Sequence, residues 1–257
     1  AVKVRADWPK RSLEVHALSD PAWDHYMPVV NNLYSGLIEY DETGAGIYYT
    51  DDSFGWGRLE TYYFYKSEQH EGGLFPQSDI HTFGARASGS LAGSTMPWAA
   101  EFALQGGDMG EASRRGHGGY AHAGWKPAVR MSPSIEAGII VLSGDDPGTE
   151  EYEGWNPLYS RWPKWSDLLI YTFASTERGV AWWDNLLAPN LELALAPLEK
   201  LSLSASVFYM AARYSRPDAG PVHGDGRYRG LLTKLRLGWS YTEYLSGHLL
   251  WEYFKPG

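Results

Sequence analysis

The stretch LEKLSLSASVFYMAARYS, residues 198–215, alternates with a period of two, and this constrains the fold more than any other feature of the chain. Apolar side chains occupy every second position from Leu201 to Tyr209, and serines fill most of the positions between them. Because successive side chains of a β-strand point to opposite faces, the pattern predicts a strand with one apolar and one hydroxyl-rich face. A helix would need apolar repeats at three and four residues, which this stretch lacks.

Segments of the same kind recur along the chain and are separated by stretches rich in Gly, Pro and Asp. In RLETYYFYK (58–66), for example, Leu59 and Tyr63 share one face while Glu60 and Lys66 share the other. The sequence therefore predicts an all-β fold of about thirteen antiparallel strands. The predicted strands lie near 1–6, 12–18, 33–40, 45–50, 58–66, 80–89, 98–106, 118–126, 133–143, 190–196, 201–212, 229–240 and 244–254.

The connections between these segments alternate in length from residue 58 onward. Long connections are expected at 67–79, 107–117, 144–189 and 213–228, and short ones at 90–97, 127–132, 197–200 and 241–243. In an up-and-down meander every second connection lies at the same end of the sheet. One end therefore has tight turns and the other has long loops, which is typical of transmembrane β-barrels.

Strand length and aromatic content indicate which solvent each face meets. Several predicted strands match the ~9–11 residues that a tilted strand needs to cross a bilayer, whereas strands of soluble proteins average about five or six. The chain has 12 Trp, 18 Tyr and 8 Phe, and several, such as Trp98 and Trp239, fall near strand ends, where membrane aromatics gather. We expect a single transmembrane β-barrel domain over residues 1–257, with lipid outside and a water-filled lumen inside.

The remaining composition excludes several functions. A net charge of −9 argues against a nucleic-acid partner, and the absence of cysteine excludes disulfides and thiolate metal sites. The sequence contains no run of 18 apolar residues, so it predicts no transmembrane helix. Motifs of nucleophilic hydrolases, zinc proteases and nucleotide-binding proteins are absent. Carboxylate pairs such as Glu101 and Glu136 could serve glycoside hydrolysis, but every charged lumen offers such pairs. We predict a protein that is not an enzyme and needs no cofactor.

Three stretches carry a resemblance to a known family. They are GGYAHAGW (118–125), SIEAGIIVLSGDDPGTEEYEGWNPLYSRW (134–162) and LSGHLLWEYFKPG (245–257). Together they resemble the alginate-export family of outer-membrane β-barrel porins, and the most specific piece is the strand GIIVLSGD followed by the acidic, aromatic loop with NPLY. The similarity covers roughly residues 58–257.

The resemblance implies a large antiparallel barrel in the outer membrane of a Gram-negative bacterium that passes a polysaccharide or small polar solute. It also implies a basic lumen suited to an anionic polymer, whereas the candidate lumen residues of this chain are of mixed charge. Bacterial single-chain barrels have an even number of strands. We therefore expect the chain to be incomplete at both termini and to form part of a larger, even-numbered barrel.

The predicted site residues fall into three groups. The first would line the pore and set its selectivity: Arg58, Glu60, Arg86, Glu101, Gln105, His122, Lys126, Glu136, Glu192, Ser204, Lys234, Arg236, His248 and Glu252. The second belongs to a loop that is a candidate to fold inward as a constriction: Asp145, Asp146, Glu151, Trp155, Tyr159 and Trp162. The third, Asp145, Asp146 and Glu150, offers oxygen ligands for calcium, although its spacing differs from the twelve-residue calcium loop and a solvated loop is the stronger reading.

The leading functional hypothesis is an outer-membrane porin that works by passive diffusion through its lumen. Its expected partners are outer-membrane lipid and the transported solute, with an envelope protein as a further candidate. Two alternatives stay open at this point. One is a soluble carbohydrate-binding or carbohydrate-cleaving β-sandwich, and the other is a structural barrel that acts as a scaffold for a partner protein.

Overall fold

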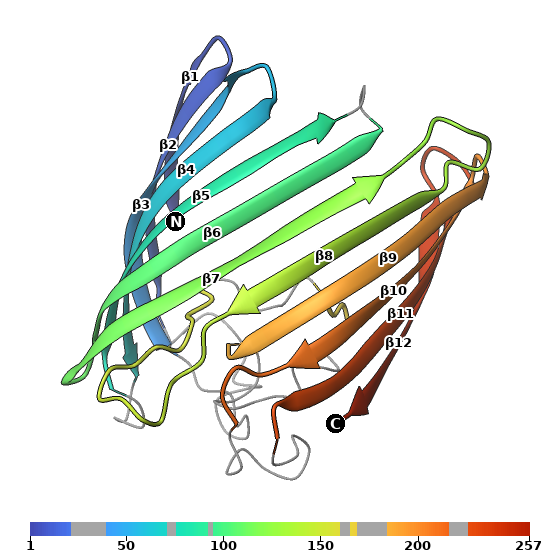
Figure 1. The fold of residues 1–257 in the computed structure, drawn as a ribbon. Helices are drawn as coiled ribbons and strands as arrows, with labels where there is room; N and C mark the ends of the chain where they lie inside the picture. Colours follow the sequence, from blue (N-terminus) through green and yellow to red (C-terminus); the bar gives the residue numbers. More distant parts are fainter. Residues whose placement is uncertain (22–39, 71–75, 92–94, 160–164, 169–183, 216–225) are drawn as a thin grey trace.

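The computed structural model describes all residues except 22–39, 71–75, 92–94, 160–164, 169–183 and 216–225. The described residues form one antiparallel sheet of twelve strands, in which each strand pairs with its neighbours in sequence (Figure 1). The strands are β1 (Val2–Trp8), β2 (Arg11–Asp20), β3 (Tyr40–Phe54), β4 (Gly57–His70), β5 (Ser78–Leu91), β6 (Met96–Met109), β7 (Ala112–Trp125), β8 (Ser134–Leu142), β9 (Leu186–Leu198), β10 (Leu201–Ala211), β11 (Tyr228–Ser240) and β12 (Ser246–Pro256).

This up-and-down architecture is the one that the alternating pattern predicts. Twelve of the predicted strands are present, and the remaining one, 33–40, lies almost wholly outside the described residues. β4, β5, β6 and β7 are each 14 residues long, more than the ~9–11 residues that cross a bilayer. The sheet ends at β1 and β12 without closing on itself.

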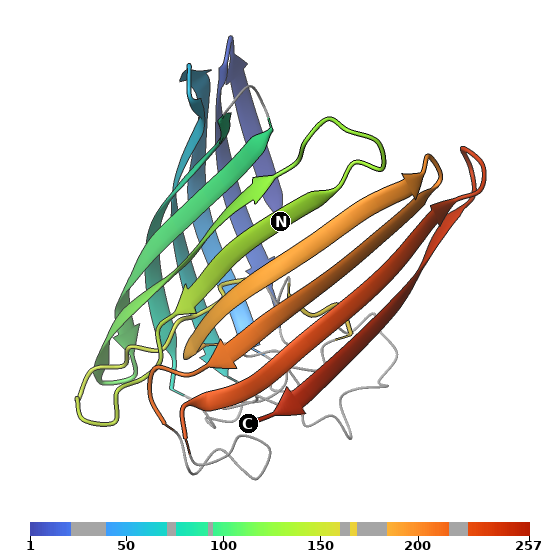
Figure 2. The same ribbon diagram turned by 45° about the vertical axis from the view of Figure 1, so that its right-hand side comes forward.

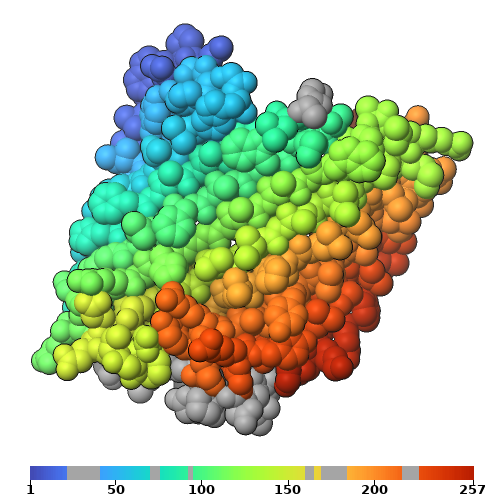
Figure 3. Space-filling model, viewed as in Figure 1, coloured from blue at the N-terminus to red at the C-terminus, as the bar shows by residue number. Residues whose placement is uncertain are grey.

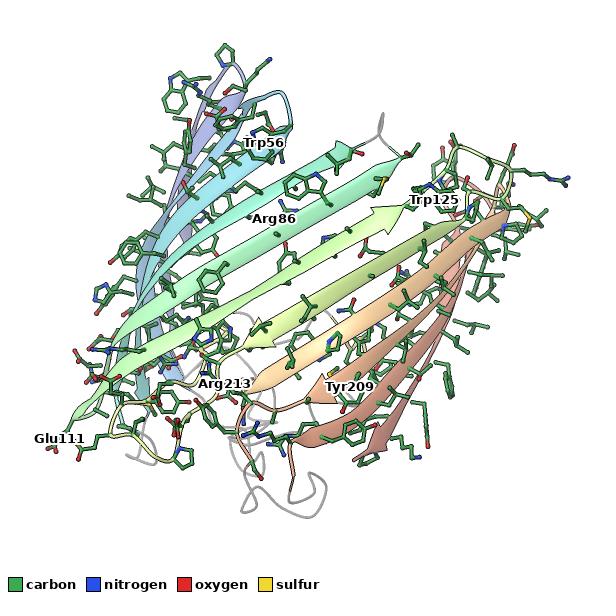
Figure 4. The ribbon with its side chains drawn as sticks, viewed as in Figure 1. Trp56, Arg86, Glu111, Trp125, Tyr209 and Arg213 are labelled. Atoms are coloured by element: carbon green, nitrogen blue, oxygen red, sulfur yellow. The ribbon has the colours of Figure 1, made fainter. Side chains whose placement is uncertain are left out.

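The prediction of one long loop is wrong. Residues 107–117 were expected to form a long connection, but β6 runs to Met109 and β7 starts at Ala112. The paired positions continue to the end, with Asp108 opposite Ser113. Glycines at 106, 107 and 110 resemble a loop in composition, yet Gly110 alone supplies the tight turn, with a φ of 62° that favours glycine. The two strands therefore project as a long hairpin, with Glu111 at its tip (Figure 4).

The two faces of the sheet differ sharply in polarity. One face presents large apolar side chains to the outside, including Leu203, Leu235 and Leu249 at 38%, 47% and 64% exposure. No second layer of described residues covers them, so these residues do not form a two-layer sandwich. Leucine and phenylalanine at such exposure across many strands are unusual for a soluble monomer and typical of a surface that meets lipid. In the space-filling view of this side, the strands lie side by side in chain order (Figure 3).

Aromatic side chains frame this apolar face at both ends of the strands. Trp56 and Trp125 lie at the end with the tight turns, while Tyr209 lies near the end with the loops (Figure 4). Exposed aromatic residues at the tight-turn end are Trp8, Phe54, Trp56, Trp125, Trp239, Tyr241 and Tyr244, and those at the loop end are Tyr209, Tyr228 and Tyr253. Two aromatic rows around an apolar band correspond to the two interfaces of a bilayer.

The sheet curves, and the described part of the β8–β9 connection lies on its concave side (Figures 1 and 2). Buried polar side chains are numerous on this side, among them Glu42, Lys66 and Glu68. A small apolar cluster around Leu186, Met210 and Leu232 lies where the β8–β9 loop packs against the wall. The described part of the chain contains no helix with the length and apolarity to cross a membrane.

Candidate pore wall and inward loop

The strand register places the predicted pore-lining residues on one face. Glu60 pairs with Arg86 and Arg86 with Glu101, which fixes this row across β4, β5 and β6. The same alternation continues through the remaining strands. The predicted residues on this face are Arg58, Glu60, Arg86, Glu101, Gln105, His122, Glu136, Glu192, Ser204, Lys234, Arg236, His248 and Glu252. Lys126 follows the end of β7 and borders a recess with Glu192, Ser204 and Arg236.

Most charges on this face are paired with one another. Glu60 accepts a hydrogen bond from Tyr48 (2.9 Å) and forms an ion pair with Arg86. Arg86 also donates to the Tyr120 hydroxyl (2.9 Å). Further along the wall, the His122 ring lies 3.0 Å from a Glu136 oxygen. The wall therefore carries both signs of charge in alternation, and it lacks the all-basic lining that the family resemblance implies.

The loop between β8 and β9 folds over this face. We call residues 143–159 and 165–168 the inward loop. Its first part lies beside β7 and pairs with it: Ser143 N–H donates to His117 O (2.8 Å) and Tyr152 N–H donates to Ser113 O (2.9 Å). Arg114, which is 1% exposed, donates to Gly154 O (2.9 Å), and its guanidinium lies 4.9 Å from the Tyr152 ring centroid. These contacts direct the chain from the strand edge toward the interior.

Asn156 is the most buried point of the inward loop, with 0% exposure. Its backbone N–H donates to Gln105 Oε1 (2.8 Å) and its carbonyl accepts from Gln105 Nε2 (2.8 Å). Its side-chain amide donates to both Glu68 oxygens (2.9 and 3.1 Å), and its Oδ1 accepts from Leu158 N–H (2.7 Å). Every polar group of this buried residue is therefore satisfied, which is the condition for burying it without a large penalty.

Lys66 supports the same region from the wall. Its ammonium group, on a side chain that is 1% exposed, lies 2.9 Å from Glu42 and 2.6 Å from Glu68 and donates to Leu158 O. The Tyr159 ring lies 5.0 Å from this ammonium, and its hydroxyl donates to Tyr65 O (3.3 Å). Burial, together with the two carboxylates, raises the pKa of Tyr159 to about 12. Tyr159 is therefore a neutral donor at physiological pH.

The inward loop reaches the opposite wall at Glu252. One oxygen of this buried carboxylate accepts from Ser166 Oγ (2.8 Å) and Leu168 N–H (3.1 Å), and the other accepts from Asp167 N–H (2.6 Å). Lys234 Nζ lies 2.7 Å from the Asp167 carboxylate and 3.8 Å from Glu252. The described parts of the loop therefore contact β4 and β6 at Asn156, and β11 and β12 at residues 166–168.

The predicted constriction residues divide into two kinds. Trp155 and Tyr159 lie against the wall; the Trp155 indole packs on Gly118, where an added Cβ would lie 2.7 Å from the ring. Asp145 and Asp146 instead accept backbone hydrogen bonds within the loop, from Glu153 and Gly148. Glu151 forms an exposed ion pair with Arg115 (3.3 Å). Trp162 lies outside the described residues.

The calcium candidates do not assemble a metal site. Within the described ranges, no group of three or more His, Asp or Glu side chains could hold a metal ion. The carboxylates of Asp145 and Asp146 accept hydrogen bonds from the backbone of Glu153 and Gly148, and Glu150 is exposed.

Sequence reasoning missed the residues that fix the inward loop, namely Asn156, Lys66, Glu68, Glu42, Arg114 and Ser166. Lys66 falls on the Glu60 face by alternation, so its inward position could have been found. Nothing in a single sequence indicates that Asn156 meets Glu68, which is 88 residues away in the chain.

The sheet is a single meander with an apolar outer face, aromatic rows and a charged concave face. These features define the class of transmembrane β-barrel proteins, although this sheet is open. A family model described as alginate export matches residues 41–219, from β3 to beyond β10. Because this is more than half of the chain, the chain belongs to the alginate-export family. No curated protein matches the sequence.

Proposed function

We propose that the protein is an outer-membrane channel that passes a polysaccharide or small polar solute by passive diffusion, with the inward loop as its constriction. One observation carries the proposal. The sheet is inverted relative to a soluble protein, because many large apolar side chains, such as Phe83, Leu203 and Leu235, are exposed on its outer face, while charged side chains such as Glu68, Lys66 and Arg114 are buried on the concave side. Such a sheet suits hydrocarbon outside and water inside.

The loop asymmetry supports an orientation. Outer-membrane barrels have short turns on the periplasmic side and long loops outside. The inward loop belongs to the long-loop end, so it would narrow the channel near its external mouth. The predicted pore-lining residues would then select solutes by charge, and no catalytic step or cofactor is required.

The open edges support a larger barrel. β1 and β12 each present a row of backbone groups without a partner strand in the sheet. In a bilayer such groups need partners, so only a closed sheet is viable. The working form would be a closed sheet. The family and the fold together support localisation in the outer membrane of a Gram-negative cell.

Conductance in planar bilayers tests the function. The folded protein should run faster in cold SDS than after boiling and should produce discrete conductance steps in a planar bilayer. Deletion of residues 146–165 should enlarge these steps if the inward loop constricts the lumen. A heat-modifiable protein without conductance would instead favour the scaffold alternative, and unchanged steps in the deletion variant would refute the constriction.

A further inference from the structure

A cavity of about 550 Å³ lies between the inward loop and the wall, from β4 to β10. This volume falls within the range of roughly 300–1000 Å³ that is usual for small-molecule sites. Residues from β6, β7 and β8 form most of its floor, and Trp155, Pro157 and Trp165 of the inward loop close one side.

Aromatic side chains dominate the lining of this cavity. Tyr62, Tyr120, Trp155, Trp165 and Phe208 contribute to it from four different parts of the chain. Aromatic faces carry partial negative charge and attract weakly positive hydrogens. The C–H faces of a pyranose ring suit such a surface, because axial hydrogens project from the faces of the ring.

The polar lining suits hydroxyl groups. Glu101 and Glu136 present carboxylate oxygens, which only accept hydrogen bonds, and Asn190 presents an amide that can do both. Glu101 receives a hydrogen bond from Tyr62 (2.6 Å), and Glu136 lies beside His122. A carboxylate has about four lone-pair positions, so each keeps room for sugar hydroxyl donors.

The charge balance distinguishes between sugar classes. Among the described residues that line the cavity, Arg86 is the one arginine or lysine, and it is already paired with Glu60 and Tyr120. Two carboxylates therefore face the cavity against one occupied guanidinium. A uronic-acid unit would bring a further negative charge to this site, where like charges disfavour one another in a partly desolvated space.

We propose that this cavity is a saccharide-binding subsite that prefers a neutral pyranose unit to a uronate. The inference rests on the proposed function, since the cavity would hold a glycan in transit behind the constriction. Trp155 supplies a stacking surface, and Glu101 and Glu136 accept hydroxyl hydrogens.

Equilibrium binding in detergent tests the subsite independently of conductance. The folded protein is titrated with maltotriose and with an alginate trisaccharide, by calorimetry. We expect maltotriose to bind at least tenfold more tightly. Trp155→Leu should weaken maltotriose binding at least fivefold, and Glu136→Gln should narrow the difference between the two sugars at least threefold.

Glu192→Gln provides the matched control. Glu192 pairs with Glu136 in the β8–β9 register and shares its face, but it does not line the cavity. Tighter binding of the alginate trisaccharide, no binding of either sugar, or equal effects of the two glutamine variants would overturn the subsite. Conductance without sugar binding would support the channel and refute the subsite. Sugar binding without conductance would support the subsite and refute the channel.

Discussion

Asn156→Ala is the most specific test of the constriction. It removes the side-chain hydrogen bonds that hold the inward loop to the wall and leaves the backbone hydrogen bonds of residue 156 in place. The variant loses the amide that donates to both oxygens of Glu68 and the Oδ1 that accepts from Leu158. It keeps the two hydrogen bonds between its backbone and Gln105. A hydrogen bond to a charged group contributes about 1.5–3 kcal/mol and a neutral one about 0.5–1.5 kcal/mol.

The two contacts to Glu68 come from one amide group and are counted here as a single hydrogen bond to a charge. With the neutral hydrogen bond, the free energy that holds the loop in place falls by about 2–4.5 kcal/mol. Since 1.4 kcal/mol corresponds to a factor of ten, the ratio of released to docked loop should rise about 30- to 1600-fold. Single-channel recordings in planar bilayers should show a larger mean conductance or frequent transitions to a larger level.

Asn190→Ala is the control for this variant. Asn190 also lies on the inner face, but its amide donates to Ala188 O of its own strand (3.1 Å). Gln105→Ala removes hydrogen bonds to the same loop residue from the wall side and should reproduce the effect of Asn156→Ala. Agreement between the two variants would distinguish release of the loop from a local folding defect. If both variants are heat-modifiable in SDS and conduct as Asn190→Ala does, the inward loop is not the constriction.

Four further substitutions test the face assignment, the wall and the packing of the inward loop. Leu235→Arg puts a charge on the lipid face and should destabilise the barrel by ~2–4 kcal/mol if it lies at the bilayer midplane. Ser204→Arg should instead fold normally and shift ion selectivity in reversal-potential measurements. Equal tolerance of the two substitutions would contradict the assignment of the faces. Lys66→Met leaves two buried carboxylates without their cation and should cost about 3–5 kcal/mol in urea unfolding from detergent, so a midpoint like that of wild type would disprove its structural role. Gly118→Val introduces a Cβ 2.7 Å from the Trp155 ring and should red-shift tryptophan emission as the indole is displaced; an unchanged spectrum would refute that packing.

Period-two alternation predicted the strands of this protein because the polarity of each face is a local property of the sequence. Residues 201–212 illustrate this, since the predicted strand differs by one residue from β10. The prediction failed at 107–117, where three glycines resembled a loop. Their φ values of 138° at Gly107 and 62° at Gly110 shape a strand irregularity and a tight turn, and glycine serves such positions as readily as it serves loops.

The site was harder to predict than the sheet, because its contacts depend on where a long loop meets the wall. Aromatic and acidic residues made the loop conspicuous, and Trp155 and Tyr159 lie against the wall. The acidic residues Asp145 and Asp146 accept backbone hydrogen bonds from Glu153 and Gly148 within the loop itself. Anchoring falls instead to Asn156 and Ser166, neutral residues whose partners Glu68 and Glu252 are 88 and 86 residues away.

The chemistry of these anchors bears on how the loop could leave the lumen. The loop is held in two ways: Trp155 and Trp165 pack on an apolar cluster of the wall, and hydrogen bonds join the loop to charged wall groups. When it leaves, Glu68 stays paired with Lys66 (2.6 Å) and Lys66 with Glu42 (2.9 Å), so the wall keeps its main ion pairs. Glu252 keeps Lys234 at 3.8 Å. Water can then replace the loop's donors at each carboxylate. The polar part of the release therefore costs the difference between protein and water hydrogen bonds rather than the full desolvation energy of a bare charge, and the exposure of Trp155 and Trp165 adds an apolar cost. A wall that remains paired in both arrangements allows a constriction to open without unfolding the barrel.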